Sequence, residues 1–149
     1  MTELEKMLAG MLYQAGDKQL VNMRNKASEL TYEYNLLRPS EKEKQQAILK
    51  ELLGSMGENV HINRPFLIDY GCHLYVGDNF FANYNFIVLD VAKVTIGNDV
   101  MIAPNVAIMT AGHPLDKDIR NELHEFGTEI TIKDGVWIGS NVVINPGVT

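Results

Sequence analysis

The sequence predicts a mainly β protein, a parallel β-helix of hexapeptide repeats that follows a small N-terminal α-helical subdomain. The first observation is a six-residue period, in which branched aliphatic residues recur in one frame at Ile96, Ile102, Ile108, Ile132, Ile138 and Ile144. The second is that glycine, asparagine and aspartate residues recur between these aliphatic positions. The third is a helical apolar pattern that is confined to the first 56 residues. A period of six fits neither a helix nor a simple hairpin, but it is typical of a β-helix.

Each six-residue side of such a prism is a short strand followed by a turn. Successive coils stack at strand spacing, about 4.7–4.9 Å, so equivalent Ile and Val side chains form ladders along the axis. The turns require residues that tolerate positive φ or hydrogen-bond their own backbone, such as Asp99, Asn105, Gly135, Asn141 and Gly147. A β-sandwich is the alternative, but a sandwich has no reason to keep one six-residue frame over such a stretch.

The N-terminal part predicts three helices. Residues 2–14 begin with a capping box at Thr2, and a second helix begins at the N-cap Asp17 and ends at Arg38-Pro39. A capping box at Ser40 opens the third helix, which Gly54 ends. The residues expected to face inward are Leu4, Met7, Leu8, Met11, Leu12, Leu20, Met23, Ala27, Leu30, Tyr34, Leu37, Ala47, Ile48, Leu49, Leu52 and Leu53.

The β-coils are expected to begin near Val60. The frame runs through Tyr70, Val76, Ala82 and Val88, and it shifts by two residues before Ile96, which indicates a bulge or a distorted corner. Residues 111–129 are polar and lack the repeat, and the frame then resumes at Ile132. Such an excursion from a regular solenoid is a place where binding and catalytic groups are expected.

Composition and charge exclude several classes of partner. The 149 residues carry a net charge of −6, and they contain no basic run, so neither nucleic acid nor an anionic membrane surface is expected as a partner. A single cysteine, Cys72, excludes an intramolecular disulfide. Because that usage suits a reducing compartment and no signal peptide or transmembrane stretch is present, a cytoplasmic location is expected.

Two domains are expected: a helical subdomain over residues 1–56 and a β-helix over residues 57–149. The segment Asn145–Thr149 lies in the middle of a coil, with no capping element after it. An uncovered β-helix end exposes a sheet edge and an apolar cross-section. The sequence therefore suggests either that C-terminal coils are missing or that something else covers this end.

His113 is the main candidate for chemistry. It stands at the start of the excursion with small neighbours, and a histidine near its free pKa can take a proton from a hydroxyl at neutral pH. Spacing alone leaves an ordinary loop histidine equally plausible. A zinc site is not expected, because the four histidines are spread out, unlike those of the γ-type carbonic anhydrases. No nucleophile is paired with a base, and no glycine-rich phosphate loop is present.

Three further residues have open interpretations. Asn83 and Asp69 lie on early coils, and spacing alone favours ordinary turn residues for both. Trp137, the single tryptophan, falls on an outward position of the repeat. A large aromatic side chain there is expected to cover either a neighbouring subunit or a flat ligand.

The sequence resembles the maltose/galactoside O-acetyltransferase family over essentially its whole length. The N-terminal helices resemble the family's small N-terminal domain, with Met7–Gly10 and Tyr34-Asn35 among the matches. The motifs that carry the resemblance in the coils are Asp69-Tyr70-Gly71, Val76–Asn83, Thr95-Ile96-Gly97, Ala103-Pro104-Asn105, Gly112-His113-Pro114, Gly135–Ser140 and Val143–Thr149.

This resemblance implies a left-handed prism and a homotrimer in which acetyl-CoA lies between adjacent prisms. His113 matches the catalytic base, which deprotonates a sugar hydroxyl for direct attack on the thioester. Asn83 matches a residue that contacts both the acceptor and the acetyl end of CoA, and Asp69 matches an acceptor-binding position. Trp137 and Ser140 match positions that line the CoA slot. The implied function is an acetyl-CoA-dependent sugar O-acetyltransferase without a metal.

The sequence also departs from the family. Ala15 and Val91 replace aspartates that galactoside-type members use to bind the acceptor, which favours a maltose- or glucose-like acceptor, or another acceptor altogether, over a β-galactoside. Thr128-Glu129 replaces the usual Lys-Pro, and Glu125 falls where maltose-type members also carry Glu. Family members continue for further coils that contribute to CoA binding. Two alternatives stay open: acetyl transfer to an antibiotic or an amino-acid hydroxyl, and a non-catalytic trimeric scaffold or inactive fragment.

Overall fold

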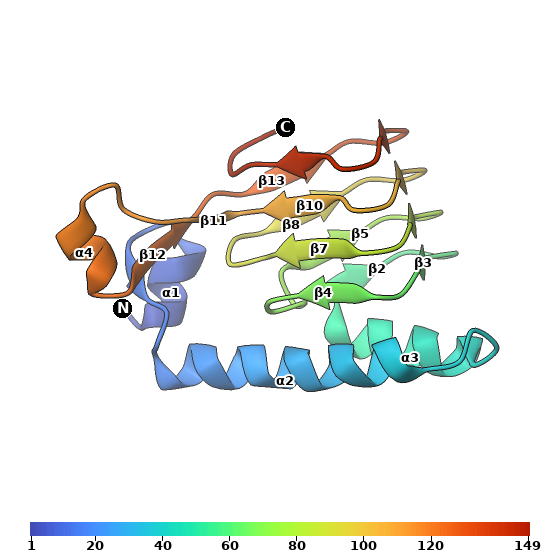
Figure 1. The fold of residues 1–149 in the computed structure, drawn as a ribbon, viewed down its shortest axis with the longest axis horizontal. Helices are drawn as coiled ribbons and strands as arrows, with labels where there is room; N and C mark the ends of the chain where they lie inside the picture. Colours follow the sequence, from blue (N-terminus) through green and yellow to red (C-terminus); the bar gives the residue numbers. More distant parts are fainter.

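A computed structural model describes all residues 1–149, and it shows a three-sided parallel β-helix that stands on two helices (Figure 1). The helical part contains α1 (Glu3–Leu8), β1 (Tyr13–Gln14), α2 (Lys18–Leu36) and α3 (Lys42–Leu52). The prism and its excursion contain β2 (Ser55–Met56), β3 (His61–Ile62), β4 (Phe66–Ile68), β5 (Leu74–Val76), β6 (Phe81–Ala82), β7 (Phe86–Leu89), β8 (Val94–Ile96), β9 (Met101–Ile102), β10 (Ala107–Met109), β11 (Ala111–Gly112), α4 (Lys117–Asn121), β12 (His124–Gly127), β13 (Ile130–Ile132), β14 (Trp137–Ile138) and β15 (Val143–Ile144).

Three four-stranded parallel sheets form the sides of the prism. Their strand orders are β13-β8-β5-β2, β14-β9-β6-β3 and β15-β10-β7-β4, so each sheet receives one strand from every coil. Stacked side chains fill the interior, as in the column of Ile62, Ala82, Ile102 and Ile138. All four of these residues are buried, which confirms the ladders that the six-residue period predicts.

Each regular coil contains twenty residues rather than eighteen. Leu74 pairs with Val94, twenty positions later, whereas Val94 pairs with Ile130 in the coil that contains the excursion. The two additional residues lie at the corner between the third and first sides, and they recur in successive coils. Consequently Ile68, and not Tyr70, stacks on Val88, so the prediction for Tyr70 was wrong.

The other two corners use residues with left-handed backbone geometry. Asn59, Asn79, Asp99 and Gly135 all have positive φ at the first corner, and Asn85, Asn105 and Asn141 have it at the second. Asparagine, aspartate and glycine tolerate this region better than other residues. This finding confirms the predicted role of Asp99, Asn105, Gly135, Asn141 and Gly147 in the turns.

The helices differ from the prediction mainly at their ends. The first helix is shorter than predicted, because Tyr13 and Gln14 form a strand, and Leu8, Met11 and Leu12 are exposed. The capping box at Ser40 does not form: Glu41 is the N-cap of α3 without a side-chain cap bond, and Ala47 is exposed. Tyr34 of α2 donates its phenol hydrogen to the carbonyl of Ile62, which ties the helix to the first coil.

The excursion is itself ordered. Its strands β11 and β12 form an antiparallel pair, β1 adds to the outer edge of β12, and α4 lies at the tip (Figure 1). The N-terminal segment therefore contacts the first coil through α2 and the excursion through β1. No helix in the structure is both long and apolar enough to span a bilayer.

Candidate functional site

His113 directly follows β11, near the start of the excursion, and its side chain is exposed. It borders a cavity of about 480 Å³ whose other lining residues are Ala15, Gly16, Arg24, Arg120, Leu123 and Glu125. Three parts of the chain thus form this cavity: the turn before α2, α2 itself and the excursion. The cavity places an accessible imidazole beside charged side chains of both signs.

The local sequence explains how the excursion presents His113. Gly112 pairs with Phe126 across the β11–β12 ladder, and a Cβ at Gly112 would lie 2.7 Å from the Phe126 ring. Leu123 has a φ of 65°, which is an unfavourable region for a bulky side chain. That turn returns the chain into β12 and brings Leu123 and Glu125 to the cavity.

Arg24 supplies a guanidinium group that has no carboxylate partner within ion-pair distance. Its Nη1 donates to the Tyr70 hydroxyl at 2.6 Å, and its Nη2 donates to the carbonyl of Ala15 at 2.8 Å. The guanidinium carbon also lies 5.6 Å from the centroid of the Tyr70 ring. Two neutral partners therefore hold the cation in place, and its remaining N–H groups are available to a ligand.

Asp69 lies at the end of β4, at the same corner of the prism as the excursion. Burial raises the pKa of its carboxyl group, the positive charge of Arg24 opposes that rise, and the negative charge of Glu125 adds to it. The structure therefore brings Asp69 into the same electrostatic environment as Arg24 and Glu125.

Glu125 does not hydrogen-bond to His113. Its Oε2 instead accepts a hydrogen bond from the Tyr13 hydroxyl at 2.8 Å. Tyr13 lies directly opposite Glu125 in the antiparallel pair of β1 and β12, so both side chains extend from the same face of the ladder.

Asn83 lies at a different corner, where the second side of the prism meets the third. Its Oδ1 accepts hydrogen bonds from the Tyr84 backbone N–H at 2.8 Å and from Asn63 Nδ2 at 3.3 Å. The side-chain oxygen is thus already hydrogen-bonded within the protein. Its Nδ2 group has no acceptor in this chain, so it is free to donate a hydrogen bond outward.

Trp137 and Ser140 lie on the last coil, on the side of the molecule where Asn83 is found. Trp137 extends outward from β14 and is 76% exposed, and it stacks in register on Met101 and Phe81. Ser140 is exposed two residues after β14. In Figure 1 these strands stand at the edge of the prism away from the excursion. One copy of the chain therefore does not bring Trp137, Ser140 and Asn83 to His113.

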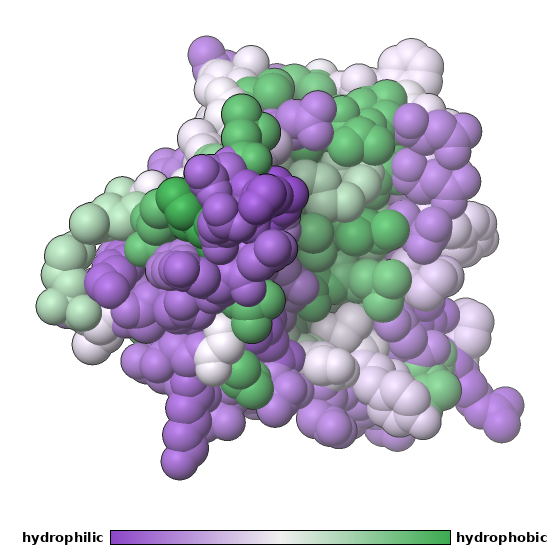
Figure 2. Space-filling model, turned by 60° about the vertical axis from the view of Figure 1, so that its left-hand side comes forward, coloured by the Kyte–Doolittle hydropathy of each residue, from purple (hydrophilic) through white to green (hydrophobic).

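An apolar face lies beside the excursion. Figure 2 shows it as a hydrophobic area next to the polar side chains that project from the excursion. Outward residues of the sheet β15-β10-β7-β4 include Leu67, 46% exposed, and Val143, 59% exposed. No helix of this chain covers that side of the prism (Figure 1).

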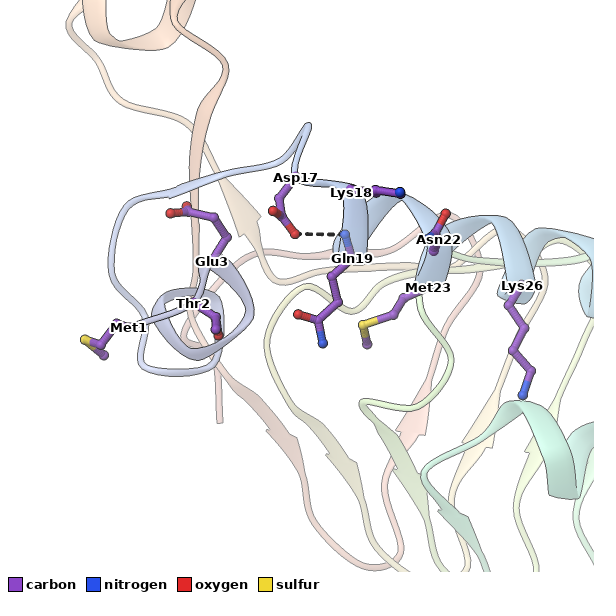
Figure 3. Close-up of a pocket in the computed structure, with 9 residues that line it drawn as sticks. All are labelled: Met1, Thr2, Glu3, Asp17, Lys18, Gln19, Asn22, Met23 and Lys26. Atoms are coloured by element: carbon purple, nitrogen blue, oxygen red, sulfur yellow. Dashed lines mark hydrogen bonds between the residues drawn. The ribbon is translucent and has the colours of Figure 1, made fainter.

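A hollow larger than the His113 cavity lies elsewhere on the molecule. A cleft of about 820 Å³ lies between the first residues of the chain and the start of α2 (Figure 3). Its lining residues are Met1, Thr2, Glu3, Asp17, Lys18, Gln19, Asn22, Met23 and Lys26. The bond from Gln19 N–H to Asp17 is the helix cap of α2. This cleft contains no histidine and no predicted site residue, so its size does not locate the chemistry.

The sequence did not single out Tyr13, Arg24, Tyr70 or Arg120 as parts of the site. Arg24 had a usable signal, because it neighbours the inward residues Leu20 and Ala27 of α2 on the helix surface. Arg120 also had a signal, because it lies in the excursion where binding groups are expected. Tyr13 and Tyr70 had none, since they reach the cavity only through Glu125 and Arg24. No group of three or more His, Cys, Asp or Glu side chains is arranged to hold a metal ion.

Known proteins match the chain over nearly its whole length. A family model, the maltose acetyltransferase hexapeptide capping motif, matches residues 6–57. A putative acetyltransferase of Saccharomyces cerevisiae is 47% identical over 97% of this chain and 74% of its own length. The galactoside O-acetyltransferase of Escherichia coli is 41% identical over 97% of this chain and 71% of its own length.

Solved structures agree with these relatives. A maltose O-acetyltransferase from Clostridium difficile superposes with a TM-score of 0.97 at 48% identity, covering 99% of this chain and 79% of that one. A galactoside acetyltransferase in complex with coenzyme A has a TM-score of 0.94 at 40% identity, covering 99% and 74%. A hexapeptide-repeat acetyltransferase of Vibrio cholerae in complex with acetyl-CoA has a TM-score of 0.89 at 37% identity, covering 99% and 79%.

These matches define the class of protein first. The prism is the left-handed parallel β-helix of the hexapeptide-repeat acetyltransferases, as the resemblance implied. Within that class, the chain belongs to the maltose/galactoside O-acetyltransferase family.

Proposed function

We propose that this acetyltransferase moves the acetyl group of acetyl-CoA to a hydroxyl of a maltose- or glucose-like sugar, with His113 as the general base. The observation that carries the proposal is the cavity of His113, where an accessible imidazole lies beside Arg24, Arg120 and Glu125. Charged groups of both signs around one cavity suit a neutral ligand with many hydroxyl groups, because each hydroxyl both donates and accepts hydrogen bonds.

The reaction is direct attack, and its atoms balance without a metal. His113 removes the proton of the acceptor hydroxyl, whose oxygen forms a bond to the acetyl carbonyl carbon. The carbon–sulfur bond of the thioester then breaks, and the CoA thiolate takes up the proton. The Nδ2 group of Asn83 donates a hydrogen bond to the developing oxyanion. This role is compatible with the two hydrogen bonds that its Oδ1 accepts, because they leave Nδ2 free and fix the orientation of the amide.

Acetyl-CoA is the proposed acetyl donor. Support comes from two structural relatives, which hold coenzyme A and acetyl-CoA. In this chain Trp137, Ser140 and Asn83 are the proposed contacts for the cofactor, and Trp137 offers an exposed aromatic face to it. Asp69 is the proposed acceptor-binding group, together with the acetyl-contacting Asn83.

The active site is proposed to lie between copies in a homotrimer. Support comes from the separation of the residues within one chain: His113 and Asp69 lie at one corner of the prism, whereas Asn83 and Ser140 lie at another corner, next to the strand that carries Trp137. An adjacent prism that packs on the apolar face beside the excursion is able to supply Asn83, Trp137 and Ser140 to the His113 of this chain. The two-domain division at residues 56 and 57 and the cytoplasmic location stay predictions.

The test is release of CoA thiol from acetyl-CoA by the purified chain, with maltose, glucose, a β-galactoside, an antibiotic, an amino acid or no acceptor. We expect release that depends on maltose or glucose, and a loss of roughly 10²–10⁴-fold in His113→Ala. Leu115→Ala is the matched control, because Leu115 is a 98% exposed neighbour in the same excursion. A His113→Ala rate close to wild type contradicts the assignment, and release with only an antibiotic or an amino acid moves the acceptor to another class.

A further inference from the structure

Tyr13 is a buried side chain that reaches the acceptor cavity only through another residue. It is 1% exposed, and its hydroxyl donates to Glu125 Oε2 at 2.8 Å. Glu125, in contrast, lines the cavity together with His113 and Arg24. Tyr13 therefore does not touch a ligand in this cavity, but it holds a group that does.

The hydrogen bond from Tyr13 leaves one of the two Glu125 carboxylate oxygens without a partner. Oε2 accepts the hydrogen bond from Tyr13, whereas Oε1 has no hydrogen-bond partner, and none of the ion pairs of the chain includes Glu125. Burial and the adjacent Glu125 carboxylate raise the pKa of the Tyr13 phenol, so the phenol stays protonated and remains the donor. A single oxygen of Glu125 is thus presented for a hydroxyl of a ligand.

The segment around Tyr13 is anchored on both sides. The Gln14 backbone N–H donates to Glu3 of α1 at 2.6 Å, and Gln14 Nε2 donates to the carbonyl of Glu122 in the excursion at 3.0 Å. Register in the β1–β12 pair then places Tyr13 opposite Glu125. These contacts limit the movement of the phenol, and therefore of the carboxylate that it holds.

We propose that Tyr13 is a positioning residue for the acceptor: its hydroxyl holds Glu125 so that the free carboxylate oxygen accepts a hydrogen bond from an acceptor hydroxyl beside His113. This inference rests on the proposed acetyl transfer. It assigns Glu125 to the acceptor rather than to His113, because no hydrogen bond joins Glu125 to the imidazole. The two assignments differ in kinetics, since an acceptor contact changes KM and an orienting contact to the base changes kcat.

The experiment compares Tyr13→Phe, Glu125→Gln and the double variant in steady-state acetyl transfer. We expect Tyr13→Phe to raise the acceptor KM about tenfold, while kcat and the KM for acetyl-CoA stay within about twofold. The double variant is expected to match Glu125→Gln, because the tyrosine acts only through the carboxylate. Tyr34→Phe is the matched control: it removes another 1% exposed phenol hydroxyl with a backbone acceptor, and it is expected to lower stability without changing KM.

Three results overturn the inference. One is an unchanged acceptor KM in Tyr13→Phe, and another is a loss confined to kcat. The third is a double variant whose acceptor KM is raised by the product of the two single effects, which would show that Tyr13 and Glu125 act independently. In each of these cases the wild type is active, so the proposed transfer stands and only the positioning role is lost. A wild-type chain that transfers acetyl to none of the sugars removes both proposals together.

Discussion

Asp90 shows at the scale of one residue how a buried carboxyl group shapes the corner below the excursion. Its side chain is fully buried, and its two carboxylate oxygens accept the backbone N–H groups of Tyr70 at 2.8 Å and His73 at 3.2 Å. The imidazole Nδ1 of His73 lies 2.7 Å from the Asp90 carbonyl oxygen. These bonds fix the corner that carries Tyr70, and Tyr70 in turn holds Arg24.

The same residue predicts a pH dependence of stability. Burial raises the pKa of Asp90 to about 7, against the opposing effect of the backbone N–H groups. Because this pKa lies above the unfolded value of about 3.9, the folded state binds more protons than the unfolded state between these pH values. The stabilising contribution is complete below pH 4 and is lost as the pH rises through 7. The buried His73, whose pKa is lowered, has the opposite dependence.

The variant Asp90→Asn separates these two effects, because it removes one titration and keeps the other. We expect the destabilisation by Asp90→Asn to be larger at pH 5 than at pH 8, by about 1–3 kcal/mol. The measurement is urea unfolding of both proteins at the two pH values and at one protein concentration. A difference in the free energy of unfolding that does not change with pH would show that Asp90 does not titrate in this range.

At the scale of one element, the corner after β8 depends on a glycine. A Cβ at Gly97 would lie 2.2 Å from Asp134 Oδ1 and 2.8 Å from the Asp134 backbone nitrogen. The Asp134 side chain cannot move away without losing a hydrogen bond, because the same Oδ1 accepts the Asn98 N–H at 2.7 Å. The related glycines Gly57 and Gly77 meet the next coil in the same way.

We therefore expect Gly97→Ala to lower the free energy of unfolding by about 2–4 kcal/mol, through steric overlap and the loss of this cap. Gly139→Ala is the control, because Gly139 is also a corner glycine but has open space where the Cβ would lie. Its change is expected to stay within about 1 kcal/mol. Equal destabilisation of the two variants in thermal or urea unfolding would show that the contact with the next coil is unimportant.

At the scale of the whole molecule, the opposite positions of His113 and Asn83 predict complementation between copies. If the chain forms the proposed trimer, His113→Ala and Asn83→Ala are each expected to be inactive on their own. In a mixed trimer some sites receive His113 from one copy and Asn83 from its neighbour. In every trimer that contains both variants, one of the three interfaces pairs an intact His113 with an intact Asn83, so roughly a third of the wild-type activity is expected once the homotrimers are removed.

The experiment is co-expression of the two variants with different affinity tags, followed by purification through both tags and the thiol-release assay. Recovery of activity in the mixed oligomer supports a site shared between copies. Mixed oligomers that contain both tags but stay inactive exclude a shared site. Monomeric chains with full wild-type activity exclude the trimer as well.

Much of the fold was predictable because it depends on residues close together in the sequence. The inward ladders follow from the six-residue period, and the tight corners follow from residues such as Asn105 and Gly135 that accept positive φ. The main error concerned Tyr70, because one local frame does not reveal that two residues are added at every third corner. His113 stood out by its place at the start of the excursion.

The sequence by itself determined the β-helix, the helical start and the position of the excursion, since side-chain period and turn chemistry are local properties. Only the tertiary structure decided that β1 pairs with the excursion and that Tyr13 holds Glu125, two residues 112 positions apart. It also decided that Arg24 lies beside His113, while Asn83 and Trp137 lie away from it. Such contacts depend on how coils, helix and excursion pack as a whole, and no local pattern specifies that packing.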